Sequence, residues 1–243
     1  MEQVARKTNS IYAAMLKAIV KGERLFAILI DPEDFNIENA KAIIQRLPDY
    51  TTHILVGGST ATHDQTEQSI IEIKKHTVLP VIIFPGDYSQ ITNNADGILF
   101  LSLLSGRNPE YLIEQQIKSV EQLRFSDLEI IPTAYILIDG GKITTVQQVS
   151  ATIPIARDNV DVIVKTALAG QFSGKKAIYL EAGSGALFPV PFQVIEAVKE
   201  AVTIPVIIGG GIRTEKQMQS AYLAGADMIV IGTAFEIITK SKN

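Results

Sequence analysis

The feature that most constrains the fold of this chain is a series of eight short apolar runs, separated by helical and turn patterns. Continuous runs such as Leu25–Ile30 and Met228–Ile231 are typical of strands buried on both faces of a parallel sheet. The runs begin near residues 25, 53, 80, 97, 129, 177, 205 and 227. Because helical patterns alternate with them, we expect parallel strands joined by crossover helices.

Eight such units in 243 residues predict an α/β fold, a TIM (β/α)8 barrel that forms a single domain over residues 1–243. An open doubly wound sheet is the alternative. It would place a Gly-x-Gly-x-x-Gly turn after the first strand, and the sequence has none there. Helices are expected over residues 10–20, 36–47, 64–75, 109–124, 159–168 with Asp158 as N-cap, 191–202 and 214–224, with a short last helix from residue 234.

The connection between the third and fourth strands is unusually short. It holds about a dozen residues, which is the minimum for a crossover connection, and includes Pro85, Gly86 and the pair Asn93-Asn94. We therefore expect the third crossover helix to be short or replaced by a loop.

Glycines gather at the ends of the last three strands. In a barrel, the carboxyl ends of all strands meet at one mouth, and the loops after the seventh and eighth strands frequently bind phosphate. Gly209-Gly210-Gly211 and Gly232-Thr233 occupy those positions. The alternative is that these glycines only turn the chain, but their position at both strand ends favours a phosphate site.

The segment Tyr179–Ala186 combines an anion-binding turn with a carboxylate. Gly183-Ser184-Gly185 leaves backbone N–H groups free to face an anion, and Glu181 comes directly before it. Strand side chains alternate, so Tyr179 and Glu181 should share a face. The segment therefore predicts a phosphate cradle beside a general base. The alternative is an ordinary strand-to-helix turn with a solvated glutamate.

Asp31 is the first carboxylate at the expected mouth. Mg²⁺ prefers one or two carboxylates together with substrate phosphate oxygens, and Ser59 or Thr60 at the next strand end could add a hydroxyl. Asp31 could instead be only a turn residue before Pro32. The chain has no Asp-Asp-x-x-Asp cluster, and its three histidines do not form a metal set.

The fourth and fifth strands are apolar up to and beyond their ends. Leu99, Phe100 and Leu101 are followed by Leu103-Leu104, and Tyr135 begins a similar run on the fifth strand. Because barrel mouths are usually polar, this predicts an apolar slot. Ordinary core beneath a loop is the alternative.

The composition excludes several classes of function. A net charge of -4 and an isoelectric point near 5.5 argue against a nucleic-acid-binding surface. The chain has no cysteine, and therefore neither disulfides nor thiolate chemistry. It shows no signal peptide and no apolar run long enough to span a bilayer, so we expect a cytoplasmic protein.

The motifs at the strand ends resemble those of the geranylgeranylglyceryl phosphate synthase family, which includes the bacterial heptaprenylglyceryl phosphate synthases. The resemblance covers nearly the whole chain, and its most specific part is Tyr179–Ala186. The other motifs are Ile30-Asp31-Pro32, Val56-Gly57-Gly58-Ser59, Phe84-Pro85-Gly86, Thr133-Ala134-Tyr135, Ile208–Arg213 and Ile231-Gly232-Thr233.

The resemblance implies a prenyltransferase that joins a long prenyl diphosphate, expected to be geranylgeranyl diphosphate, to sn-glycerol 1-phosphate. It implies that Asp31 and Ser59 bind Mg²⁺ and that Glu181 and Tyr179 are catalytic. The acceptor would contact Tyr179, Leu180, Glu181, Ala182, Gly183, Ser184, Gly185, Gly210, Gly211, Gly232 and Thr233. We also expect a homo-oligomer, peripheral membrane contact through the lipid product, and no nucleic-acid partner. Leu29 is a departure, because some bacterial members carry lysine there.

Three other functions fit parts of the pattern. A sugar-phosphate isomerase or lyase would need a second acid or base opposite Glu181, and Asp139 could serve. A flavin-dependent oxidoreductase could use the same terminal phosphate site. A non-catalytic phosphate-binding protein is the third, and the pairing of Asp31 with Ser59 argues against it.

Overall fold

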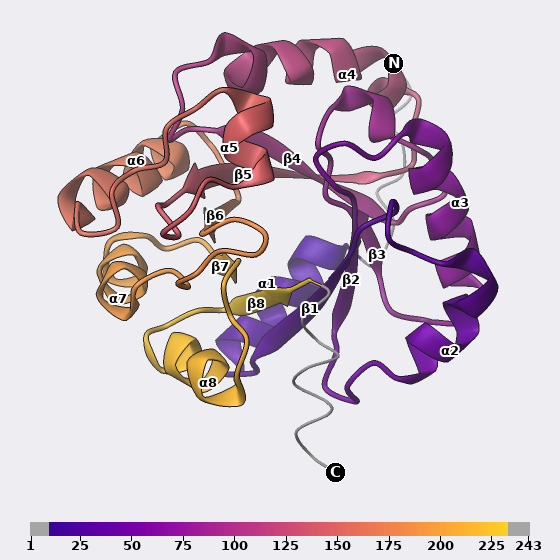
Figure 1. The fold of residues 1–243 in the computed structure, drawn as a ribbon, viewed down its shortest axis with the longest axis horizontal. Helices are drawn as coiled ribbons and strands as arrows, with labels where there is room; N and C mark the ends of the chain where they lie inside the picture. Colours follow the sequence, from indigo (N-terminus) through magenta and orange to yellow (C-terminus); the bar gives the residue numbers. More distant parts are fainter. Residues whose placement is uncertain (1–9, 233–243) are drawn as a thin grey trace.

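A computed structural model of the protein describes residues 10–232, and its strands form a closed barrel in chain order (Figure 1). Every neighbouring pair is parallel, including the β1–β8 pair that closes the barrel. The TIM barrel predicted from the sequence is confirmed. The strands are β1 (Leu25–Ile30), β2 (His53–Val56), β3 (Val81–Ile83), β4 (Gly97–Leu103), β5 (Glu129–Leu137), β6 (Ala177–Glu181), β7 (Val206–Gly209) and β8 (Met228–Ile231).

All the helices except α1 lie around the outside of the strands (Figure 1). The helices are α1 (Ile11–Val20), η1 (Ile37–Asn39), α2 (Ala40–Gln45), α3 (His63–Lys74), η2 (Tyr88–Gln90), η3 (Glu110–Glu114), α4 (Gln115–Arg124), α5 (Thr145–Ser150), α6 (Val160–Phe172), α7 (Phe192–Ala201) and α8 (Glu215–Leu223). None of these helices is long and apolar enough to cross a membrane.

The core has two layers because strand side chains alternate. On β6, Ala177 and Tyr179 point into the barrel, where they pack with Leu99 and Ile207. Leu180, between them and Glu181, packs in the layer between the strands and the helices. The same alternation on every strand fills the interior with apolar side chains below the mouth.

The third crossover is the short connection that the sequence predicted. Only the 3₁₀ turn η2 lies between β3 and β4, so no full helix covers this part of the barrel. Its N-cap Asp87 accepts a hydrogen bond from the backbone N–H of Ser89 at 2.7 Å.

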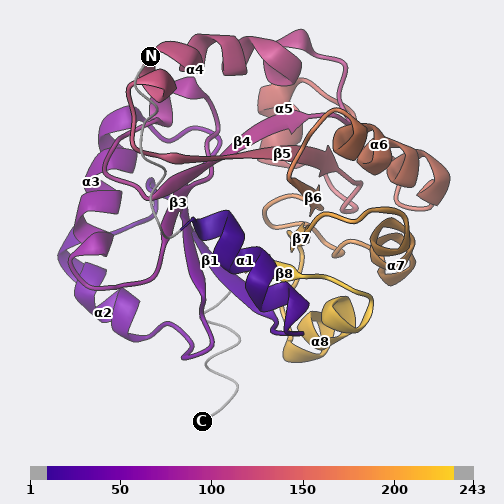
Figure 2. The same ribbon diagram turned by 180° about the vertical axis from the view of Figure 1, so that it is seen from behind.

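Helix α1 lies across the end of the barrel opposite the mouth (Figure 2). Its Met15 is 2% exposed and packs with the barrel interior. Glu129 at the start of β5 accepts hydrogen bonds from the Ser10 hydroxyl and from the backbone N–H groups of Ile11 and Tyr12. The N-cap of α1 is Ser10, whose hydroxyl accepts the backbone N–H of Ala13 at 3.1 Å. The Glu129 carboxylate adds to this cap and fastens the helix to the base of the barrel.

One predicted helix cap is wrong, and one helix was not predicted. Asp158 is not the N-cap of α6, because the side chain of Asn159 accepts the hydrogen bond from Val162. Helix α5 was not predicted, since it is one short turn-rich segment without a clear apolar period. The helix expected from residue 109 begins as the π-helical turn η3. The expected last helix from residue 234 lies outside the described residues.

Candidate active site

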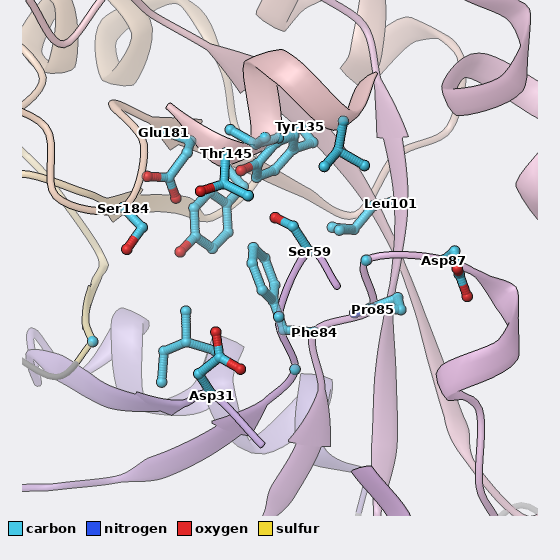
Figure 3. Close-up of a pocket in the computed structure, with 18 of the residues that line it drawn as sticks. Asp31, Ser59, Phe84, Pro85, Asp87, Leu101, Tyr135, Thr145, Glu181 and Ser184 are labelled. Atoms are coloured by element: carbon cyan, nitrogen blue, oxygen red, sulfur yellow. The ribbon is translucent and has the colours of Figure 1, made fainter. Parts of the chain in front are cut away.

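A cavity of about 430 Å³ opens at the carboxyl ends of the strands. Figure 3 shows Glu181 and Ser184 on one side of it and Asp31 on the other, with Phe84 between them. The predicted site residues that line it are Asp31, Ser59, Tyr179, Glu181, Ser184, Gly185, Gly210, Gly211 and Gly232. Residues from distant parts of the sequence therefore meet at the mouth.

Tyr179 and Glu181 share a face of β6, as the strand alternation predicted. Both side chains point toward β7, where a Cβ on Gly209 would overlap the Tyr179 hydroxyl and lie 2.6 Å from Oε2 of Glu181. A Cβ on Gly210 would overlap Oε1 of the same carboxylate. The glycines after β7 thus leave the space that the two side chains occupy.

Glu181 is only 6% exposed, and burial raises the pKa of its carboxyl to about 7. The backbone N–H of Gly183 donates to Oε1 at 2.5 Å and opposes this rise in pKa, and the nearby Tyr179 hydroxyl opposes it to a lesser extent. A carboxyl with this pKa can accept and release a proton near neutral pH.

The Tyr179 hydroxyl is fully buried, and among the described residues it has no hydrogen-bond partner that satisfies normal geometry. The centroid of the Tyr179 ring lies 5.1 Å from that of the Phe84 ring and 5.4 Å from that of the Tyr135 ring. Burial and the Glu181 charge raise its pKa well above the ordinary value, so the hydroxyl keeps its proton and can donate it in a hydrogen bond.

The loop after β6 and the loop after β7 form one cradle. Gly210 and Gly211 have φ angles of 79° and 71°, a conformation that favours glycine. Arg213 donates hydrogen bonds from its guanidinium to the carbonyl oxygens of Gly185 and Ala186, at 3.2 and 2.6 Å. The guanidinium thereby fixes the second half of Gly183–Ala186 against the β7 loop.

Some predicted contact residues lie elsewhere. The side chains of Leu180 and Ala182 pack in the layer between strands and helices, so only their backbone could face a ligand. Gly183 is covered by Thr144, which a Cβ at this position would overlap. Thr233 lies outside the described residues.

Asp31 lies at the opposite end of the cavity, half buried at the end of β1. Burial raises the pKa of its carboxyl, while the backbone N–H of Glu33, which donates to Oδ1 at 3.1 Å, opposes the rise. A Cβ on Gly58 would lie 2.5 Å from the same Oδ1, so the loop carrying Ser59 passes directly beside the carboxylate. The Thr60 hydroxyl donates to Glu33 at 2.6 Å and joins the two loops.

Much of the remaining lining is apolar, and it extends beyond the barrel. It includes Phe100, Leu101 and Tyr135, three of the four side chains expected to form the slot, whereas Leu99 is 1% exposed in the interior core. Further lining residues come from η2 and α4: Tyr88, Gln115, Gln116 and Ser119. The cavity therefore continues as a groove where the third crossover helix is missing.

Asp139 is not placed opposite Glu181. Its Oδ1 accepts the backbone N–H of Gly141 at 2.8 Å, and the side chain does not line the cavity. The second acid or base that a sugar-phosphate isomerase or lyase would need is therefore not supplied by Asp139.

The sequence model of the PcrB family matches residues 18–241. The chain belongs to the PcrB family. A relative from Zunongwangia profunda named geranylgeranylglyceryl phosphate synthase is 57% identical over 93% of this chain and 97% of the relative. One of the same name from Flavobacterium johnsoniae is 49% identical over 94% of each chain.

A crystal structure supports the same assignment. The (S)-3-O-geranylgeranylglyceryl phosphate synthase from Thermoplasma acidophilum, in complex with its substrate sn-glycerol-1-phosphate, matches with a TM-score of 0.89 and 36% identity, over 96% of this chain and 95% of that one. The family recognised from the motifs is confirmed, and with it the prediction of an enzyme of the transferase class.

Four parts of the site in this PcrB family chain were not predicted as such from the sequence. Arg213 and Phe84 stood in recognised motifs, but nothing in the sequence indicated that one clamps the cradle and the other stacks on Tyr179. The Nζ of Lys142 lies 3.0 Å from where a Cβ on Gly185 would be. The only sequence signal for placing Lys142 near the site is its position directly after Gly140-Gly141. Gln90 lies in the connection between the third and fourth strands, for which the sequence predicted only a short length.

Proposed function

We propose that this protein is a Mg²⁺-dependent prenyltransferase. It would join a long prenyl diphosphate, with geranylgeranyl diphosphate the expected donor, to the free primary hydroxyl of sn-glycerol 1-phosphate, giving an ether-lipid precursor and diphosphate. The observation that carries the proposal is one continuous cavity with a buried carboxyl beside a glycine cradle at one end, Asp31 at the other, and an apolar groove leading away.

The cradle suits the acceptor. Backbone N–H groups at Ser184, Gly185, Gly210 and Gly211 can bind a phosphate. A molecule the size of glycerol phosphate bound there would extend its far hydroxyl toward Glu181 and Tyr179. The complex of the Thermoplasma acidophilum enzyme with sn-glycerol-1-phosphate supports this acceptor and its stereochemistry.

The opposite end suits a diphosphate held through a hard cation. Asp31, Glu33 and Asp34 line it, and the only cationic side chain among the described lining residues is Arg213, at the cradle. Residues 10–232 contain no group of three or more His, Asp or Glu side chains that could hold a metal alone. Asp31 with the Ser59 hydroxyl therefore fits Mg²⁺ that completes its shell with phosphate oxygens, where it would neutralise charge on the leaving group.

The reaction needs one proton transfer. The acceptor oxygen forms a C–O bond to the allylic carbon while the bond from that carbon to the diphosphate oxygen breaks, and the electron pair leaves with the diphosphate. The hydroxyl proton passes to the Glu181 carboxylate. Tyr179 donates a hydrogen bond that orients the acceptor, and the apolar groove keeps water from the allylic carbon.

The direct test is incubation of the protein with Mg²⁺, sn-glycerol 1-phosphate and prenyl diphosphates of several chain lengths, followed by mass spectrometry of the products. We expect a prenyl ether of glycerol phosphate, and far less of it from sn-glycerol 3-phosphate. Prenyl alcohol alone, or no product with any donor, would contradict the proposal. A colourless purified protein would additionally argue against a flavin enzyme. Homo-oligomer formation, peripheral membrane contact and a cytoplasmic location stay predictions.

A further inference from the structure

The loop that carries Ser59 is packed between two others. A Cβ on Gly57 would overlap the carbonyl oxygen of Phe84, and a Cβ on Gly86 would overlap that of Gly58. The loops after β2 and β3 therefore touch backbone to backbone, with no side chain between them. Backbone contact alone does not determine the position of the Ser59 loop relative to the neighbouring loops, so hydrogen bonds must fix that position.

The backbone N–H of Gly57 donates to the carbonyl oxygen of Ile30 and the Thr60 hydroxyl donates to Glu33, which ties the loop to the β1 side. On the β3 side the bonds come from Gln90, the last residue of η2, which is 1% exposed. Its Nε2 donates to the carbonyl oxygens of Gly58, at 2.8 Å, and Ala61, at 2.9 Å. Its Oε1 accepts the backbone N–H of Gly86 at 2.9 Å. The side-chain amide thus joins three backbone groups, and the two carbonyls lie on either side of Ser59 and Thr60.

The place of this contact links it to the candidate Mg²⁺ corner. Gly58 lies against the Asp31 carboxylate, and Ser59 follows it. Moving the carbonyl of Gly58 would move Ser59 relative to Asp31. A helix at the third connection would have covered this part of the barrel, whereas the short connection delivers a buried amide to the loop instead.

We propose that Gln90 is a positioning residue that sets Ser59 against Asp31 and so determines how tightly the protein binds magnesium diphosphate. The inference rests on the proposed function for the identity of the ligand. Gln90 does not touch the substrates; it acts through the backbone of Gly58 and Ala61.

The test replaces Gln90 and separates the two substrates. Gln90→Met keeps the length of the side chain but removes all three bonds. Gln90→Glu keeps an acceptor for Gly86 and turns an oxygen toward two carbonyls. For both variants we expect the Kd of magnesium pyrophosphate, measured by calorimetry, and the KM of the prenyl diphosphate to rise about 10- to 100-fold, the usual effect of losing a residue that orients a metal ligand. The KM of glycerol 1-phosphate should stay within about two-fold.

Two controls accompany these variants. Gln122→Met changes an exposed glutamine on α4 and should leave the binding of both substrates unchanged. Asp227→Asn weakens the bonds of Asp227 to Lys199 and Val206 far from the mouth, so it reports what lost stability does by itself. If Gln90→Met weakens the binding of both substrates equally, and by as much as Asp227→Asn does, the role of Gln90 is merely structural and the inference is overturned.

The calorimetric arm does not depend on turnover. Suppose that the wild type binds magnesium pyrophosphate and that Gln90→Met binds it more weakly. The positioning role then holds even if no prenyl ether forms, and only the proposed function fails. If the wild type transfers prenyl groups and Gln90→Met binds magnesium pyrophosphate as well as the wild type does, the positioning role fails alone. A wild type that binds no magnesium pyrophosphate also overturns it.

Discussion

At the scale of single residues, the carboxyl groups at the two ends of the cavity lie in different environments. Glu181 is fully enclosed and has a pKa of about 7, so it can act as a base that is only just ionised at neutral pH. Asp31 is half buried, and its raised pKa results from burial that a bound cation would offset. One carboxyl thus suits proton transfer and the other suits cation binding.

Replacing Asp31 tests the cation end. Asp31→Asn removes the negative charge that would hold Mg²⁺ near the diphosphate, while the residue stays at the mouth and the fold should survive. We expect turnover to fall by about two to three orders of magnitude, which corresponds to a few kcal/mol of lost charge stabilisation. Asp161→Asn on the exposed surface of α6 is the control. Near-normal turnover of Asp31→Asn would remove Asp31 from the metal site.

The pKa of Glu181 also predicts a stability effect. Because the folded-state pKa of about 7 lies above the ordinary value of 4.5, folding binds a proton between these values. The stability contribution of this carboxyl is therefore fully present below about pH 4.5 and is lost as pH rises through about 7. Glu181→Gln cannot ionise, so at high pH it should be more stable than the wild type by up to about 3 kcal/mol.

Denaturant unfolding at about pH 8 and about pH 4.5 measures this difference. The advantage of Glu181→Gln should be present at the higher pH and absent at the lower one. Glu121→Gln, on the exposed face of α4, should show no such dependence. A Glu181→Gln variant that is less stable than the wild type at the higher pH contradicts the assigned environment.

Glu181 and Tyr179 could be paired from the sequence because strand alternation fixes their common face. The roles of Gln90 and Arg213 could not be predicted, because each side chain bonds to carbonyl oxygens that only the folded loops bring near. Leu180 differs from these two, because the same strand alternation turns its side chain toward the helices although its motif suggested a contact residue.

At the scale of elements, the missing third helix is the feature that shapes the groove. The short third connection could be predicted from the spacing and from Pro85 and Gly86, because about a dozen residues is the minimum for a crossover connection and these two disfavour a helix. Helix α5 could not be predicted from the sequence, because Thr145–Ser150 lacks a helical spacing of apolar residues. It is stabilised by tertiary hydrogen bonds, such as the one that the Asn108 side chain donates to the carbonyl oxygen of Ser150 at 2.8 Å. Short helices depend on such contacts rather than on propensity.

The groove predicts a change in donor preference. Ser119 is 3% exposed and lines the cavity from α4, so Ser119→Phe would fill part of the space available to the prenyl chain. Each methylene excluded should cost about 0.8 kcal/mol of binding, and the preferred donor should become shorter. Competition between donors of different length measures this shift. The neighbouring Val120→Phe, at a position 53% exposed, should leave the preference unchanged; a shift in both variants or in neither would place the prenyl chain elsewhere.

At the scale of the whole molecule, the barrel separates stability from chemistry. The mouth carries the loops of the site, and the opposite end is closed by α1, which Glu129 helps to cap and hold. The order of strands and the barrel itself followed from the alternation of eight apolar runs. The contact of α1 with the barrel base did not, because it depends on a carboxylate 118 positions away from Ile11.

This separation predicts a variant that is less stable but fully competent. Glu129→Ala leaves Ser10 as the N-cap of α1 but removes the carboxylate that accepts from the Ser10 hydroxyl and from the first backbone N–H groups of the helix. It should lower the unfolding free energy by about 1–2 kcal/mol, similar to the loss of an N-cap. Thermal unfolding measures the loss, and kcat and both KM values should stay near those of the wild type. Glu121→Ala on α4 controls for removal of an exposed carboxylate. A large fall in kcat for Glu129→Ala would mean that the two ends of the barrel are coupled.

The central claim is that the acceptor hydroxyl meets the allylic carbon beside Glu181, which takes the proton. Steady-state kinetics of Glu181→Gln at about pH 8, with saturating prenyl diphosphate and varied sn-glycerol 1-phosphate, tests it most directly. We expect kcat to fall about 10²- to 10⁴-fold, the range of general-base catalysis, with a much smaller change in the acceptor KM, because glutamine keeps the shape and a hydrogen bond. A higher acceptor KM with kcat intact would show that Glu181 only binds the hydroxyl, and would contradict the claim.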